Sequence, residues 1–542
     1  MLEERPPEPR EAFPAKTRGN DRIPVFALII IVLFWVLQNP LSDRLSAFLP
    51  GHHKELAKAA AGGGGGVPDS VVEAILSIDL EAKLSFFGNE NLPPAAAVLV
   101  GRSGRSVRGE ALAEAIDAFR KHPDQPSLAR RVILLRGEMG EPPLAPLPPA
   151  RKNGKPGPLP LAAYQPKPGM DAASARLLTN EADTWRLLFG PQPILPAAQA
   201  QAVLAGVRQM PNLRWWGKVA LHLVYLRAHD NARAVAEIHA VDREARAAVV
   251  LASLVGALSG LAMLVGSIVL IVLIVTRGQV GGPLARRAPL IADSERRLGA
   301  GDLIGFFALY LVLMLVASAL APAAFSGVID QAQKRSQSAA LVWVIGLEAG
   351  VTLLCGSITV AALAVYARAR GARLSREIGL NAGGGHLLRT IAFGLLGWCI
   401  SLPILYGASA ILKPLLHHVP SPANPAIPLL MSAPGGWASV TLYILVAVIA
   451  PFFEETMFRG IFYNAARLRV GVGWGIAATG LAFGLAHPVG LMEQIPLALL
   501  GALFAWMAQT RKSLLPSMVA HCLQNSFVYA TLLFTLMWVT GR

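Results

Sequence analysis

The chain has 542 residues, of which 54% are hydrophobic and only 15% are charged. Soluble domains carry about 25% charged residues, so this composition is typical of an integral membrane protein. The net charge of +15 comes from Lys and Arg that lie largely in short loops between apolar segments and in one long polar region, without a nucleic-acid-binding motif. We therefore expect membrane lipids, and no nucleic acid, as partners of these charges.

The first part of the chain combines a tail, an anchor and the long polar region. Residues 1–22 are polar and Pro-rich, which predicts a disordered cytosolic tail. Residues 23–41 are mainly apolar and lack a small-residue cleavage site, so we expect an uncleaved transmembrane anchor. Residues 50–246 show helix-like spacing of Leu, Ala and Val and predict a mainly helical domain with Gly-rich and Pro-rich linkers. We expect Trp215 and Trp216 to pack in its core or to anchor it at the membrane interface.

Apolar segments follow one another closely after this region. Nearly all approach or exceed the roughly 20 residues that a spanning helix needs; the segment 472–487 is short. The segments are 247–275, 304–324, 339–366, 390–412, 438–463, 472–487, 491–509 and 514–539. With the anchor they predict an all-α polytopic membrane protein of about nine transmembrane helices, with the helical domain inserted between the first two. We divide this part into residues 247–389, with basic cytosolic loops, and a membrane core at 390–542.

The arginines predict the orientation in the membrane. The loops 277–303 and 367–389 each hold five arginines, and the later turns hold Arg467 with Arg469 and Arg511 with Lys512. These basic loops alternate with less basic ones, so the positive-inside rule favours a cytosolic N-terminus. The helical domain would then lie outside the cytosol. The Ala-, Gly-, Arg- and Leu-rich composition indicates a bacterial inner membrane.

Two adjacent carboxylates and an arginine interrupt the apolar segment 438–463. A charged side chain at membrane depth costs roughly 2.5–3.5 kcal/mol on insertion scales, so such residues are rare and usually functional. Glu455 and Arg459 are four residues apart and can pair on one helix face, whereas Glu454 lies about 100° away around the helix. We therefore expect one neutralised carboxylate and one, Glu454, that is available for chemistry. A buried ion pair that only fixes helix register is the structural alternative.

Three more polar residues are expected at depth in later segments. His487 ends the short segment, and His521 and Asn525 are four residues apart in the last one. A lone intramembrane His or Asn often serves only as a hydrogen bond between helices. A carboxylate, two imidazoles and an amide at one depth are costly together, so we predict a site that activates water or binds a metal.

These residues carry a resemblance to a known family. Three motifs resemble, in order and on successive apolar segments, those of the CPBP family (CAAX protease and bacteriocin-processing, or Abi), which includes the type II CAAX prenyl endopeptidases. They are Glu454-Glu455-x-x-x-Arg459, Phe483-x-x-x-His487 and His521-x-x-x-Asn525. The similarity covers roughly residues 390–540 and leaves the preceding part of the chain unexplained.

The resemblance implies hydrolysis of a peptide bond within the membrane. Glu454 would be the general base that takes a proton from water, assisted by His487. His521 and Asn525 would stabilise the oxyanion on the scissile carbonyl. The ion pair beside Glu454 would orient its helix. The substrate would be a membrane-associated protein or peptide, and neither its prenylation nor the oligomeric state follows from the sequence.

A metal-dependent form of this mechanism remains open. His487 and His521 would then bind Zn²⁺, with Glu454 and Asn525 nearby, and the metal would lower the pKa of bound water towards about 7. Asn is a poor zinc ligand, so a closed structural site with four protein ligands is not expected.

Two non-proteolytic functions compete with this interpretation. One is a membrane immunity or abortive-infection protein that acts by binding alone. The other is a proton-coupled transporter, which is disfavoured because no internal repeat with paired broken helices is evident. The sequence Gly299-Ala-Gly-Asp302 matches the Gly-x-Gly-Asp of presenilin-type aspartyl proteases, but it lies at a loop end without a second intramembrane Asp, and we reject it.

Overall fold

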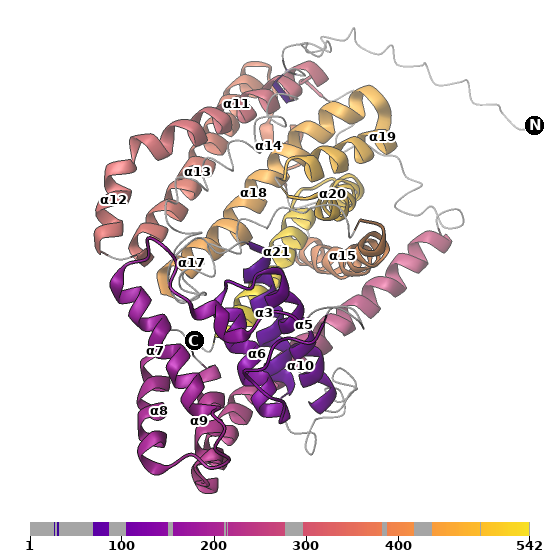
Figure 1. Cartoon of the computed structure of the whole chain (residues 1–542). Coiled ribbons are helices and arrows are strands. Elements are labelled where there is room, and N and C mark those ends of the chain that lie inside the picture. Colours follow the sequence, from indigo (N-terminus) through magenta and orange to yellow (C-terminus); the bar gives the residue numbers. More distant parts are fainter. Residues whose placement is uncertain are drawn as a thin grey trace, which may run out of the picture. The chain divides into compact units, whose positions relative to one another are not determined.

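The computed structural model describes most of the chain as helices (Figure 1). The residues described are 69–85, 104–149, 156–210, 213, 215–276, 296–335, 337–381, 387–416, 436–487 and 489–540, together with Ala27, Ile30 and Ile31. Within these residues every regular element is a helix, as the sequence predicts. The chain forms two compact units, one comprising residues 46–261, 423–439 and 529–542, and the other residues 1–45, 262–422 and 440–528. We call them the polar unit and the membrane unit.

The polar unit is built from short helices that pack on their neighbours in sequence. They are α3 (Asp69–Ser85), α5 (Gly104–Lys121), α6 (Pro126–Met139), the 3-10 helix η2 (Pro160–Tyr164), α7 (Ala172–Leu188), α8 (Ala197–Gln209), α9 (Trp215–Arg227) and the first part of α10 (Asn231–Thr276). The start of α17 (Gly436–Ile444) and the second half of α21 (Leu515–Thr540) also belong to this unit. Local signals set their ends: Asp171 caps α7 by accepting from the Ser174 amide at 2.9 Å, and Gly140 ends α6 in a left-handed conformation with φ of 74°.

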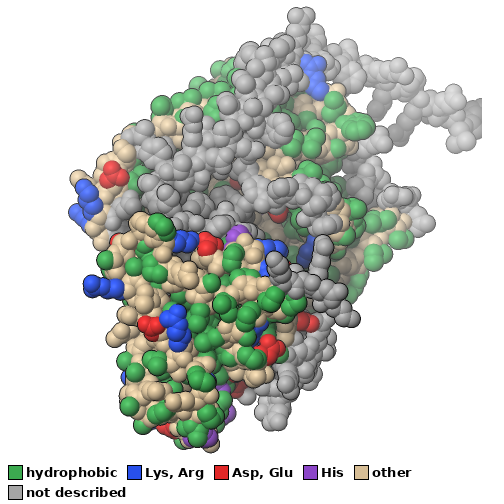
Figure 2. All heavy atoms as spheres, viewed as in Figure 1, with side chains coloured by type: hydrophobic (Ala, Val, Ile, Leu, Met, Phe, Trp, Pro, Cys, Tyr) green, Lys and Arg blue, Asp and Glu red, His purple; other side chains and the backbone are tan. Residues whose placement is uncertain are grey.

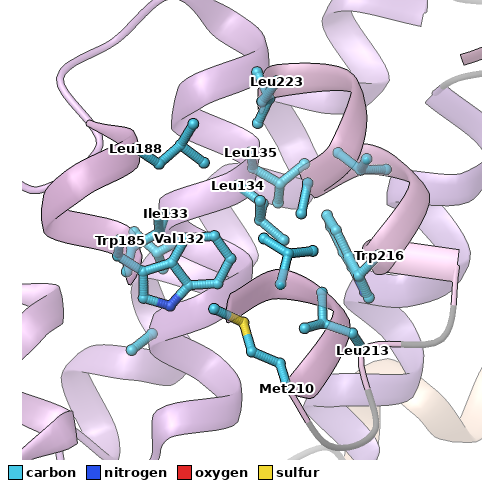
Figure 3. Close-up of a cluster of buried hydrophobic side chains, with 14 of the residues drawn as sticks. Val132, Ile133, Leu134, Leu135, Trp185, Leu188, Met210, Leu213, Trp216 and Leu223 are labelled. Carbon is cyan, nitrogen blue, oxygen red and sulfur yellow. The ribbon is translucent and has the colours of Figure 1, made fainter. Parts of the chain in front are cut away.

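The core of the polar unit contains both tryptophans that the sequence singles out. Trp215 and Trp216 are buried and stack with their ring centroids 4.2 Å apart. Figure 3 shows Trp216 and Trp185 among the aliphatic side chains of α6. The Trp216 indole donates to Asp79 at 2.8 Å, and Asp79 also pairs with buried Arg131 at 2.6 Å. Core packing is therefore their role. Acidic and basic side chains are interspersed on the face of this unit seen in Figure 2.

The membrane unit holds the long apolar helices. Its elements are the end of α10, α11 (Ala300–Ala324), α12 (Ser326–Arg335), α13 (Gln337–Ala369), α14 (Leu374–Glu377), α15 (Leu387–Leu416), most of α17 (Gly436–Ile444), the π-helix η4 (Leu445–Ile449), α18 (Ala450–Glu454), the π-helix η5 (Glu455–Phe462), α19 (Tyr463–Leu485), α20 (Leu491–Arg511) and the first half of α21 (Leu515–Thr540). Ala27, from the predicted anchor, is buried in the same hydrophobic cluster as Leu303 and Phe307 of α11.

Six helices among the described residues are long and apolar enough to cross a membrane. They cover Ser253–Val275, Ala300–Ala321, Val342–Ala369, Leu387–Leu416, Gly436–Leu485 and Leu491–Arg511. This pattern is that of a multi-pass membrane protein. The expected total of about nine is not confirmed, because the anchor at 23–41 lies largely outside the described residues and α21 is not among the six.

The longest of these, Gly436–Leu485, is not straight. Gly471 has φ of 83° and ψ of 174°, a conformation that glycine adopts without a steric penalty. The turn there is so tight that a Cβ atom on Gly475 would lie 3.0 Å from the Cα of Arg467. The chain therefore turns sharply between the two predicted segments 438–463 and 472–487.

Glycines also bring α19 and α20 into close contact. A Cβ atom on Gly480 would lie 2.5 Å from the Ala498 carbonyl oxygen, and one on Gly484 would lie 2.5 Å from that of Gln494. Small residues at this spacing let two helix backbones approach closely in a membrane. This contact positions the elements on which the candidate site is built.

Candidate active site

The two glutamates lie at the junction of two helical forms. Glu454 ends α18 and Glu455 begins the π-helix η5, and a second π-helix, η4, ends only five residues before Glu454. π-Helical turns are rare and are frequently found at functional sites. The backbone is thus irregular on both sides of the Glu454–Glu455 pair.

Glu455 and Arg459 form the buried ion pair that their spacing predicts. Arg459 Nη1 donates to Glu455 Oε1 at 2.8 Å, and both side chains are 0% exposed. Arg459 Nη2 also donates to the carbonyl oxygen of Gly501 on α20 at 3.1 Å. The guanidinium is therefore held between two helices by two acceptors, while Arg459 Nε and Glu455 Oε2 have no hydrogen-bond partner in the described residues.

Aromatic rings enclose this guanidinium. Its centre lies 4.3 Å from the ring centroid of Phe483, 5.3 Å from that of Phe504 and 5.9 Å from that of Phe458. Cations are attracted to aromatic faces, and more strongly where water is excluded. Phe504 and Phe458 carry no signal in the sequence that separates them from other apolar residues, whereas Phe483 is the first residue of the second motif.

His521 lies between the two glutamates. Its Nδ1 is 3.0 Å from Glu455 Oε1, and its Nε2 is 3.8 Å from Glu454 Oε2. A carboxylate only accepts, so the proton of a neutral His521 is assigned to Nδ1 and Nε2 carries a lone pair. Glu454 Oε2 is buried and has no hydrogen-bond partner among the described residues. Glu454 Oε2 and His521 Nε2 therefore remain available as two hydrogen-bond acceptors on the side of the imidazole opposite Glu455.

His487 has a fixed tautomer as well. Its Nδ1 lies 2.8 Å from the carbonyl oxygen of Phe483, one helical turn earlier, so Nδ1 donates and Nε2 is left as an acceptor. The ring centroid of Phe483 lies 4.8 Å from that of His487 and 5.7 Å from that of His521. Both histidines therefore contact one phenylalanine ring, although His487 follows the end of α19 and His521 is on α21.

Asn525 is held by the backbone of η4. Its Nδ2 donates to the carbonyl oxygen of Val446 at 2.7 Å. Only the amide nitrogen can donate to a carbonyl, so this contact decides which way the amide is turned. The amide nitrogen keeps a second hydrogen for another acceptor.

The rejected aspartyl-protease motif lies at the start of α11. Asp302 of the rejected Gly-x-Gly-Asp sequence accepts from the Gly299 amide at 2.9 Å and from the Tyr366 hydroxyl at 2.7 Å. Asp302 thus stabilises the start of α11.

The predicted metal ligands do not form a complete metal site in the described residues. No group of three or more His, Cys, Asp and Glu side chains in the described part of the chain could hold a metal ion. The Nδ1 atoms of His487 and His521 both contact protein acceptors, which is also the usual arrangement of histidines that bind a metal through Nε2. Zinc binding by these two residues stays a prediction.

Comparison with known families identifies the segment that carries these contacts. Residues 436–527 match the family model of Rce1-like proteins, described as type II CAAX prenyl endopeptidase Rce1-like. No curated protein and no solved structure matches the chain. The match confirms the resemblance drawn from the motifs, and all six predicted site residues lie within the Rce1-like segment.

At the level of the family, the Rce1-like segment supports an intramembrane endopeptidase of the CAAX-protease type. Multiple apolar helices and a membrane-protease family agree in placing the protein in a membrane.

Proposed function

We propose that the membrane unit hydrolyses a peptide bond of a membrane-associated protein or peptide, with Glu454 as the general base. The observation that carries this proposal is the position of His521 between two unlike glutamates. Glu455 is fully buried, is neutralised by Arg459 and bonds to one side of the imidazole, whereas Glu454 has a side chain that is 26% exposed and lies 3.8 Å from the other side. Each carboxylate keeps one oxygen without a hydrogen-bond partner in the described residues.

A water molecule fits the chemistry of the gap beside Glu454. Glu454 Oε2 and His521 Nε2 are both acceptors, so a stable contact between them needs a donor. A water that donates one hydrogen to each would have its oxygen lone pairs directed away from both, towards a carbonyl carbon. His487 Nε2 is a further acceptor, which would accept from this water in place of His521 whenever His521 Nε2 carries a proton.

Hydrolysis would then proceed as follows. Glu454 takes a proton as the water oxygen bonds to the carbonyl carbon, and the carbonyl oxygen becomes an oxyanion. The second N–H of Asn525 donates to this oxyanion, as does His521 whenever Nε2 carries a proton, with Glu455 balancing the charge. Glu454 returns its proton to the amide nitrogen, the C–N bond breaks, and a carboxylic acid and an amine are released.

The arrangement of the basic loops supports the proposed orientation. Arg296 donates to the Asn464 side chain at 2.6 Å and to the Glu377 carbonyl at 3.1 Å, and Arg467 donates to Asn464 at 3.0 Å. The Leu514 amide donates to Gly379 at 2.9 Å. The described parts of the four Arg-rich connections thus meet at one end of the membrane unit, which supports placing all four on the same side of the membrane.

The test is a cleavage assay on the purified full chain in liposomes. The probe is an internally quenched, farnesylated CAAX peptide, because the family description refers to prenyl endopeptidases. We expect Glu454→Gln to lower kcat by about 10²–10⁴-fold, the usual contribution of a general base. Asp330→Asn is the control, since Asp330 is an exposed carboxylate on α12, a helix that carries none of the predicted site residues, and it should retain activity.

The same assay separates the competing explanations. Full activity in the Glu454→Gln variant would refute the general-base role. Loss of wild-type activity with a zinc chelator, restored by added Zn²⁺, would support the metal form of the mechanism. A folded wild-type protein that cleaves neither this probe nor an unprenylated version would favour the binding-only alternative.

A further inference from the structure

The carbonyl of Val446 is left without its usual helical donors. In the π-helix η4, the Ala450 N–H bonds to the carbonyl of Leu445, five residues earlier. In an α-helix that N–H would bond to Val446 instead. The next residue is Pro451, which has no N–H at all. The two backbone groups that could serve Val446 are therefore engaged elsewhere or missing.

Asn525 supplies the missing hydrogen bond. Its Nδ2 donates to the Val446 carbonyl oxygen at 2.7 Å, from α21 to η4. A carbonyl without a donor is costly in an apolar, water-poor environment, so this acceptor holds the amide firmly. The first N–H is thereby fixed, and because the amide is planar the second N–H also points in one direction.

We propose that Pro451 is a positioning residue for Asn525. By withholding a backbone N–H, Pro451 reserves the Val446 carbonyl for the Asn525 side chain. The amide then presents its second N–H to the oxyanion without having to reorient during the reaction, which is where a preformed donor is most effective. Pro451 is on the same short helix, α18, as the general base Glu454. This inference rests on the proposed function for its catalytic consequence, and on the backbone geometry for the contact itself.

A thermal-stability cycle on the full chain in detergent tests the contact. Asn525→Ala leaves the Val446 carbonyl without a donor, and we expect Tm to fall by about 2–4 °C. Pro451→Ala supplies an N–H near that carbonyl, so Asn525→Ala should lower Tm by less than half as much in the Pro451→Ala background. Pro403→Ala, which changes a proline inside α15, is the matched control and should leave the Asn525→Ala effect unchanged.

An activity cycle with the farnesylated peptide probe tests the consequence. We expect Pro451→Ala to lower kcat about 10-fold with little change in KM, and Asn525→Ala to lower it about 10²-fold. The double variant should be no less active than Asn525→Ala alone, because both changes remove the same donor. A proline that only shapes the helix would instead give losses that multiply.

The stability cycle and the activity cycle test separate claims, so a negative result in one does not decide the other. An equal Tm loss for Asn525→Ala in both backgrounds, or multiplying losses of kcat, would overturn the role of Pro451. If the wild-type chain does not cleave the probe, the proposed function fails on that substrate, and the stability cycle still decides whether Pro451 reserves the carbonyl.

Discussion

At the scale of single residues, the buried ion pair explains why charge is tolerated at this depth. Glu455 and Arg459 are both fully buried, and Glu455 also bonds to His521 at 3.0 Å. A buried pair gives little net stability relative to apolar residues, but removing one partner leaves an uncompensated charge. The pair is therefore better understood as a support that fixes the imidazole than as a source of stability.

The cost of a lone buried charge can be measured directly. We expect Arg459→Met to destabilise the protein by about 3–5 kcal/mol, because Glu455 would remain buried without its cation. The double variant Glu455→Gln, Arg459→Met should recover much of that loss. Thermal unfolding of the three proteins in one detergent provides the comparison, and a double variant less stable than Arg459→Met alone would contradict this account.

The sequence predicts part of this site well. Glu455 and Arg459 pair because their separation of four residues alone brings them together. Their contact with His521 depends on how η5 and α21 pack, and no spacing along the chain encodes it. The aromatic rings around the Arg459 guanidinium are likewise not predictable from the sequence, because no pattern distinguishes Phe458 and Phe504 from other apolar residues.

At the scale of elements, hydropathy predicts where helices form but not how they are wound. The described helices cover the apolar segments expected after the polar region. The π-helices η4 and η5 are not predictable from that pattern, because one extra residue in a turn leaves the apolar run unchanged. Yet η4 is what frees the carbonyl that binds Asn525.

The contact of α19 with α20 should be intolerant of even one methyl group. Gly480→Ala places a Cβ atom 2.5 Å from the Ala498 carbonyl, so the helices must separate. Such overpacking typically costs about 1–3 kcal/mol, and it should lower both Tm and kcat. Gly350→Ala on α13, where the added atom meets nothing within 4 Å, is the control. Equal effects of the two substitutions would show that the contact is not tight.

At the scale of the whole molecule, the chain combines a unit with the core of a soluble helical protein and a unit with an apolar surface suited to lipid. The polar unit buries ion pairs such as Arg131–Asp79 inside an aliphatic core, as soluble helical proteins do. The membrane unit exposes many large apolar side chains, which is expected where lipid takes the place of water. The sequence predicts this division through composition, because charged and proline-rich stretches are concentrated before residue 247 and long apolar segments follow it.

The proposed orientation makes opposite predictions for two exposed basic residues. Lys121 ends α5 of the polar unit, and Arg368 is near the end of α13, beside the Arg-rich connections. In spheroplasts, a membrane-impermeant maleimide should label Lys121→Cys directly, but Arg368→Cys only after permeabilisation. The wild-type chain is the background control, since its Cys355 and Cys399 are buried and Cys522 is half-buried. The reverse labelling pattern would invert the topology, and with it the side of the membrane on which the polar unit could meet substrates.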